Sequence, residues 1–122
     1  MKGYFTANNR IPKLDIIVAW TQGAQILRSL IDTGFTGALA VPTNIARELG
    51  LQVKGIEDVT YGDGSIRPTP TALAVAVLAD GTKKVVNVLI TEGSPAIGVQ
   101  FLMDYELKMN FKYYTIDLER SI

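Results

Sequence analysis

The chain has 122 residues, of which 48% are hydrophobic and 20% charged, and its twelve basic and twelve acidic residues balance to a net charge of zero. This length and composition predict one folded domain, residues 1–122, with a substantial buried core. The balanced charge and the lack of a Lys/Arg-rich run argue against nucleic-acid binding and against attachment to a membrane surface.

Cysteine and histidine are both absent from the sequence. Disulfides, thiolate nucleophiles, Ser-His-Asp and Cys-His catalysis and the common zinc sites are therefore excluded. An enzyme built on this chain has to use carboxylates as its acid and base, with tyrosine or lysine as lesser options. We expect neither a metal ion nor a cofactor.

The beginning of the chain bears on where the protein resides. The first twenty residues include Arg10, Lys13 and Asp15 and lack the apolar stretch of a secretory signal. No run approaches the roughly 18 apolar residues that a membrane span requires. We therefore expect a soluble, cytoplasmic protein.

The N-terminal third predicts an arm and two strands. Residues 1–12 are polar and mixed, and are expected to form an arm or an edge segment. Residues 13–20 alternate as a strand does, with one apolar face formed by Leu14, Ile16, Val18 and Trp20. After a turn at residues 21–23, residues 24–31 return as a strand. That strand is apolar on both faces near its end, which is typical of a central strand.

A short strand and a helix come next. The strand is expected at residues 38–41, and residues 42–50 predict a helix of two turns or fewer. Thr43 or Asn44 is expected to cap its N-terminus, and Gly50 to end it.

The pattern of the second half of the chain predicts a series of strands. Alternating patterns predict strands at 53–61, 67–78, 84–91, 107–111 and 114–118, with a short helix at 99–105. In the strand at 67–78, the alanines lie on one face and the larger apolar residues on the other: Ala72, Ala74 and Ala76 against Leu73, Val75 and Val77. The sequence therefore predicts an all-β (mainly β) fold of seven or more strands with one or two short helices.

One acidic residue stands between two apolar segments. Leu30 and Ile31 end one predicted strand, Asp32 follows, and residues 38–41 begin the next. The glycines between them permit a sharp turn. A carboxylate held near an interior is costly unless it is paired or hydrogen-bonded, and such placements commonly serve chemistry.

Three segments, in this order, resemble the retropepsin-like aspartic proteases of the small, single-domain prokaryotic type. The first runs from Ile31-Asp32-Thr33-Gly34-Phe35-Thr36-Gly37 to Val41-Pro42. The second is the glycine-rich hairpin Tyr61-Gly62-Asp63-Gly64-Ser65, at the place of the flap. The third is Ala96-Ile97-Gly98, which is similar to the hydrophobic-hydrophobic-glycine element of the family. Phe35 differs from the small residue that viral enzymes carry after the glycine.

The resemblance implies a closed acid-protease-like barrel with one lobe per chain. It implies catalytic roles for Asp32, Thr33 and Gly34, and a flap over a peptide substrate formed by Tyr61, Gly62, Asp63, Gly64 and Ser65. It also implies that Ala38, Ile97 and Gly98 support the catalytic loop.

The hypothesis that this chain is an aspartic protease requires two copies of the chain. Aspartic protease chemistry uses two carboxylates that share one proton, and the sequence has a single Asp-Thr-Gly. We therefore expect an aspartic endopeptidase that works as a homodimer on peptide or protein substrates, with Asp32 contributed by each subunit.

Alternatives remain for each segment and for the whole chain. Asp32 can be the carboxylate of an Asx-turn, residues 61–65 an ordinary hairpin turn, and residues 96–98 the end of a core strand. The protein can be a non-catalytic dimeric peptide-binding or structural protein on the same fold, or a β-barrel module unrelated to proteases.

Overall fold

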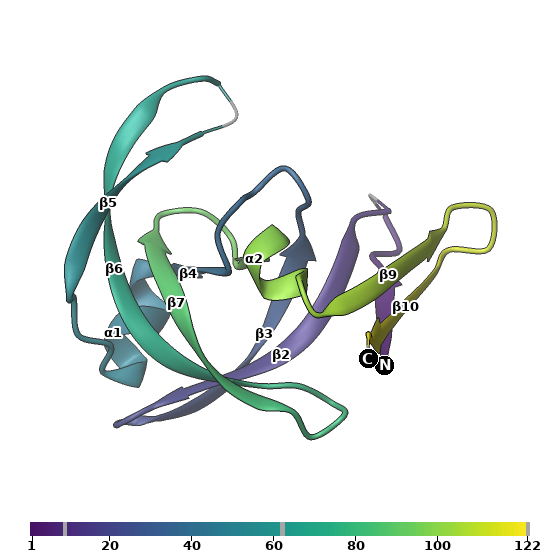
Figure 1. Ribbon diagram of the computed structural model, residues 1–122, viewed down its shortest axis with the longest axis horizontal. Helices are drawn as coiled ribbons and strands as arrows, with labels where there is room; N and C mark the ends of the chain where they lie inside the picture. The colour runs from purple at the N-terminus through teal and green to yellow at the C-terminus, as the bar shows by residue number, and fades with distance from the viewer. Residues whose placement is uncertain (9, 62, 122) are drawn as a thin grey trace.

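A computed structural model describes residues 1–8, 10–61 and 63–121, and Figure 1 shows how the strands and the two short helices are arranged. The elements are β1 (Lys2–Phe5), β2 (Pro12–Trp20), β3 (Gly23–Ile31), β4 (Leu39–Pro42), α1 (Thr43–Leu49), β5 (Gly55–Thr60), β6 (Ile66–Val77), β7 (Lys83–Thr91), β8 (Ala96–Ile97), α2 (Val99–Leu102), β9 (Tyr105–Asn110) and β10 (Thr115–Arg120). Within the described residues, neither helix has the length and apolar character needed to cross a bilayer.

Six strands close into a barrel in the order β2-β3-β8-β4-β7-β6, because β6 pairs with β2 as well as with β7. The pairs β3–β8 and β4–β7 are parallel, and the other pairs around the barrel are antiparallel. β5 extends the sheet beyond β6, while β1, β10 and β9 extend it beyond β2 (Figure 1). The prediction of a closed, mainly β barrel is therefore confirmed.

The barrel interior follows the predicted alternation, and it selects small residues on β6. On β2, the side chains of Leu14, Ile16 and Val18 are buried. On β6 the alanines point inward and are fully buried, whereas Leu73 on the opposite face is 37% exposed. β6 pairs with β7 along one edge and with β5 and β2 along the other, so its inward side chains lie within the closed sheet.

The helix α1 ends as predicted but begins differently. Gly50 closes it in the left-handed region (φ 75°), and its N–H donates to the carbonyls of Ala46 and Arg47. The N-terminal cap is Pro42, which makes no side-chain cap hydrogen bond, so the prediction of Thr43 or Asn44 as the cap was wrong. The hydroxyl of Thr43 instead donates to the Glu92 carboxylate (2.9 Å).

The N-terminal segment is an interior strand and not the predicted arm or edge. β1 pairs antiparallel with β2 on one side and with β10 on the other. Gly3 permits this close packing, because a Cβ at that position would lie 2.6 Å from the carbonyl oxygen of Lys13. The two ends of the chain therefore lie side by side, joined by the pairing of β1 with β10 (Figure 1).

The helix and strands after β8 also differ from their predicted bounds. α2 ends at Leu102, short of the predicted residue 105, because Tyr105 already begins β9. The two last predicted strands, at 107–111 and 114–118, are observed with shifted bounds as β9 and β10, which pair antiparallel, and the buried residues of β10 are Ile116 and Leu118.

Candidate active site

The loop that joins β3 to β4 carries Asp32 and is held by β8. β8 lies between the two strands, parallel to β3 and antiparallel to β4. The backbone N–H of Asp32 donates to the carbonyl of Ile97 (3.0 Å), and that of Gly98 donates to the carbonyl of Ala38 (3.0 Å). Ala38 and Ile97 are buried. Of the residues expected to support the loop, Ile97 and Gly98 therefore bond directly to its two ends, and Ala38 is the end that Gly98 contacts.

Gly98 has no space for a side chain. A Cβ there would lie 2.3 Å from the carbonyl oxygens of both Phe35 and Gly37. Its backbone angles (φ −118°, ψ −171°) suit any residue, so the requirement for glycine comes from the close contact alone. The next residue, Val99, donates its N–H to the carbonyl of Phe35 (2.8 Å). The loop is thus packed tightly against the start of α2.

The Asp32 carboxylate is half-buried and closes a local turn. Its Oδ1 accepts the N–H of Gly34 (3.0 Å), and its carbonyl accepts the N–H of Phe35 (3.1 Å). A Cβ on Gly34 would lie 3.3 Å from Oδ1, so glycine allows this tight contact. Thr33 is exposed. In the described part of the chain, the second carboxylate oxygen of Asp32 accepts no hydrogen bond, which leaves it available to a water or a substrate.

The hairpin tip between β5 and β6 is closed by local bonds. The N–H of Tyr61 donates to the carbonyl of Ser65 (2.8 Å), and Gly64 adopts φ 84°. Oδ1 of Asp63 accepts both the N–H and the hydroxyl of Ser65, at 2.9 and 2.6 Å. These bonds, with a smaller contribution from Arg67, hold the pKa of the Asp63 carboxyl below its usual value. Gly62, also expected in the flap, lies outside the described residues.

Tyr61 turns back along the hairpin. Its hydroxyl lies 3.2 Å from the Thr69 hydroxyl, and the Arg67 guanidinium stacks 4.6 Å from the centre of its ring. Arg67 also lies 3.5 Å from the Asp63 carboxylate. The side chains at the base of the tip therefore form one cluster.

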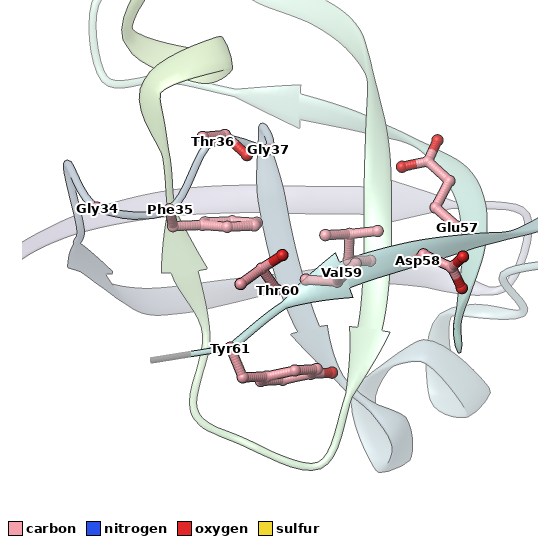
Figure 2. A pocket seen from close by; sticks show the side chains of 10 residues that line it. Gly34, Phe35, Thr36, Gly37, Glu57, Asp58, Val59, Thr60 and Tyr61 are labelled. Atoms are coloured by element: carbon pink, nitrogen blue, oxygen red, sulfur yellow. The ribbon is translucent and has the colours of Figure 1, made fainter. Parts of the chain in front are cut away.

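A groove runs between the Asp32 loop and this hairpin. Next to Asp32 it forms a cavity of about 440 Å³, whose walls include Phe35, Tyr61, Leu89 and Glu92. A second cavity of about 410 Å³ adjoins it and shares six of the lining residues: Gly34, Phe35, Val59, Thr60, Tyr61 and Leu89. Figure 2 shows the second cavity, with the Phe35 ring and the side chains of β5 around it. Of the predicted catalytic and flap residues, Asp32, Gly34 and Tyr61 line this groove, whereas Thr33, Asp63, Gly64 and Ser65 are not among its lining residues.

Several groove residues were not predicted from the sequence. Leu89 and Val59 belong to alternating strands, and the alternation alone does not tell which face meets the groove. Glu57 is exposed, and with Asp58 it lines the second cavity. Phe35 was noticed only as a departure from the viral pattern.

The described residues contain no group of three or more acidic side chains placed to hold a metal ion. Comparison of the chain with protein-family models, with curated proteins and with solved structures finds no match.

Proposed function

We propose that this chain is an aspartic endopeptidase that acts as a homodimer. The observation that carries the proposal is the position of Asp32. Its half-buried carboxylate lines an open groove and is fixed by a loop that β8 braces. The groove's other wall is a protruding hairpin, which suits an extended peptide held between the two.

The chemistry requires a second carboxylate. Like charges about 3 Å apart do not both ionise, so a pair of aspartates holds one proton and supplies an acid and a base together. The base takes a proton from a water that attacks the scissile carbonyl, and the acid protonates the oxygen of that carbonyl. The C–N bond then breaks, the amine leaves with a proton, and no covalent enzyme intermediate forms. Asp32 of a second chain supplies the second carboxylate.

The exposed position of Thr33 agrees with this dimer. In the retropepsin-like pattern this threonine bonds across the two-fold axis and fixes the two loops. Here Thr33 follows Asp32 directly and its side chain is exposed. Gly34 adds no side chain beside the carboxylate, so a water has room there.

The strand β9 offers an edge suited to a second copy. It is the last strand of the sheet, and among the described residues it pairs only with β10. Glu106 and Lys108 are exposed on either side of the half-buried Leu107. If two β9 strands pair antiparallel about an axis at Leu107, Glu106 of each chain faces Lys108 of the other. The edge is therefore self-complementary in charge.

The central experiment replaces Asp32 with Asn. Asp32→Asn should abolish hydrolysis of a peptide library while leaving the dimer folded, as judged by sedimentation and circular dichroism. Glu92→Gln is the matched control, since Glu92 is another carboxylate of the same cavity and its Oε1 already accepts the Thr43 hydroxyl. Full activity in Asp32→Asn contradicts the proposal, and so does loss of activity only in Glu92→Gln.

The dimer has its own test at β9. Glu106→Lys sets like charges opposite each other twice across the axis, so dimerisation should weaken about ten- to thirtyfold. The double variant Glu106→Lys/Lys108→Glu should restore it, because the charge pairs are reversed. Sedimentation equilibrium and the concentration dependence of activity measure both effects. Glu48→Lys, at an exposed position of α1, controls for the change in net charge. If Glu106→Lys leaves dimerisation unchanged, the edge of β9 is not the dimer interface.

A non-catalytic peptide-binding dimer remains the second candidate. The hydrogen bond from Gly34 to Asp32 is the observation that favours it, since an Asx-turn of this kind is also a purely structural device. Binding of library peptides without cleavage at any pH would favour this candidate over the protease.

A further inference from the structure

Lys84 stands at a core-facing position of β7. It pairs in register with Ala76, which is fully buried, and it shares its face of the strand with the buried Val86 and Val88. Burial lowers the pKa of the Lys84 ammonium group, against the opposing influence of Asp104. A cation on this face is costly to remove from water, so the contacts that it makes have to offset that cost.

The ammonium group of Lys84 reaches the short helix α2. Its Nζ donates to the carbonyl oxygen of Phe101 (2.9 Å) and lies 4.0 Å from the centre of the Phe101 ring. The Tyr105 ring is a second aromatic neighbour, with its centre 5.3 Å away. The last carbonyls of a helix have no partner within the helix, and a lysine can supply one. Lys84 therefore anchors the C-terminal end of α2 to β7.

The N-terminal end of α2 is bonded to the Asp32 loop. Val99 donates its N–H to the carbonyl of Phe35 (2.8 Å), and the N–H of Gln100 donates to the carbonyl of Gly37 (3.2 Å). A helix of four residues has too few internal hydrogen bonds to be stable by itself. Its position therefore depends on the groups that hold its two ends, which are the loop at one end and Lys84 at the other.

We propose that Lys84 is a positioning residue for Asp32. It fixes the C-terminal end of α2, and α2 in turn fixes the loop whose course sets the direction of the Asp32 carboxylate. This inference rests on the proposed function, because it names a residue that prepares the same site for its chemistry. A role in stability alone does not account for a cation here, since replacing a buried charged group with a well-packed apolar one is often neutral or stabilising.

The test separates the geometry of the loop from the stability of the whole chain. Lys84→Met keeps the apolar stem and removes the ammonium group. Amide hydrogens of Asp32, Val99 and Gln100 should then exchange about five- to tenfold faster, because the bonds between α2 and the loop open more often. The amides of β2 and the midpoint of urea unfolding should stay at their wild-type values. With a peptide substrate, kcat should fall about five- to tenfold at unchanged KM.

Two further variants show whether the donor itself is responsible. Lys84→Arg should behave nearly as wild type in both measurements, because a guanidinium also donates to a carbonyl. The cavity of about 270 Å³ that adjoins Lys84, Tyr105 and Arg120 gives the larger group room. Lys83→Met, at the neighbouring exposed position of β7, is the matched control and should leave both measurements unchanged.

Three results would overturn the inference. The first is wild-type exchange at the loop in Lys84→Met. The second is faster exchange throughout that variant with a lower urea midpoint, which would show a general role in stability. The third is a Lys84→Arg chain that behaves like Lys84→Met, which would show that the donated hydrogen bond is unimportant.

Exchange and hydrolysis report on the two proposals separately. Hydrolysis whose kcat is unchanged in Lys84→Met keeps the protease and removes the positioning role. Faster exchange confined to α2 and the loop, in a chain whose wild type cleaves no peptide, supports Lys84 as the residue that fixes the loop and removes the protease.

Discussion

The two walls of the groove are built in different ways. The Asp32 loop is bonded to Ile97 of β8 and to Gly98, which follows it, and Ile31 and Ala38 on either side of the loop are buried. The hairpin of β5 and β6 stands out from the barrel (Figure 1), and its tip is closed by bonds within residues 61–65. Ile56 and Ile66 on this hairpin are 69% and 67% exposed.

This difference agrees with the separate roles that the proposed protease would give to the loop and the hairpin. A carboxylate that takes part in proton transfer has to be held in one geometry, and the loop achieves that through long-range contacts. A hairpin that covers a substrate has to open and close, and few tertiary contacts leave it free to do so. Substitutions in the loop should therefore change stability and chemistry, and substitutions in the hairpin should change mainly substrate binding.

The largest effect should follow substitution of Gly98. In Gly98→Ala the new methyl group meets two carbonyl oxygens of the Asp32 loop, so the loop has to move. We expect the free energy of unfolding, measured by urea denaturation, to fall by about 2–3 kcal/mol. Most of the peptidase activity should also be lost.

A matched glycine distinguishes this contact from a general effect of glycine replacement. Gly93 also lines the Asp32 cavity, and a Cβ there meets no atom within 4 Å. The stability of Gly93→Ala should stay within about 0.5 kcal/mol of wild type. Equal losses in the two variants would show that the contact at Gly98 is unimportant.

A second prediction concerns the pH dependence of hydrolysis. Two coupled Asp32 carboxylates give a bell-shaped profile, because the base is lost on the acid side and the shared proton on the alkaline side. We expect a maximum on the acidic side of neutral, with kcat/KM falling about tenfold per pH unit beyond each limb. A rate that is flat from about pH 4 to pH 9 would argue against a carboxylate pair.

The smallest effect should come from the hairpin tip. Asp63→Asn weakens the bonds to Ser65 and removes the ion pair with Arg67, so KM should rise about two- to threefold at constant kcat. The bell-shaped profile should keep its form. A tenfold fall in kcat would mean that the tip also positions the chemistry.

The tip also has a pH dependence of its own. Because the pKa of Asp63 is lowered in the folded protein, its bonds to Ser65 are complete above the ordinary aspartate value and are lost as pH falls through the lowered pKa. The amide chemical shift of Ser65 in the wild-type protein should report this transition below the ordinary value. The transition should be absent in Asp63→Asn.

Much of the fold was predictable because local patterns carry it. The alternation of Leu14, Ile16 and Val18 predicts the buried face of β2, and Gly50 ends α1 in the conformation that glycine permits. The prediction failed for β1, since a polar segment of mixed character gives no sign of the two strands that flank it. It also missed Pro42 as the cap of α1, because the hydroxyl of Thr43 is used by the distant Glu92.

The candidate site, like the fold, was partly predictable from local sequence and partly dependent on long-range contacts. Asp32, Thr33 and Gly34 were identified from a contiguous motif, and the hairpin at residues 61–65 from its glycines. That Asp32, Gly34 and Tyr61 line one groove depends on contacts between β8 and the loop and on the course of β5. Glu57 shows what sequence-based prediction misses. Its place beside the groove follows from the path of the hairpin, and no local sequence pattern indicates it.

The sequence by itself limited the available chemistry: without histidine or cysteine, an enzyme built on this chain has to rely mainly on carboxylates, and with one Asp-Thr-Gly the proposed protease needs a second chain. Only the tertiary structure decided which strands close the barrel, that alanines face inward on β6, and which carboxylates share the groove with Asp32. The physical reason is that chemical identity belongs to each residue, whereas strand order and register depend on contacts between residues far apart in the chain.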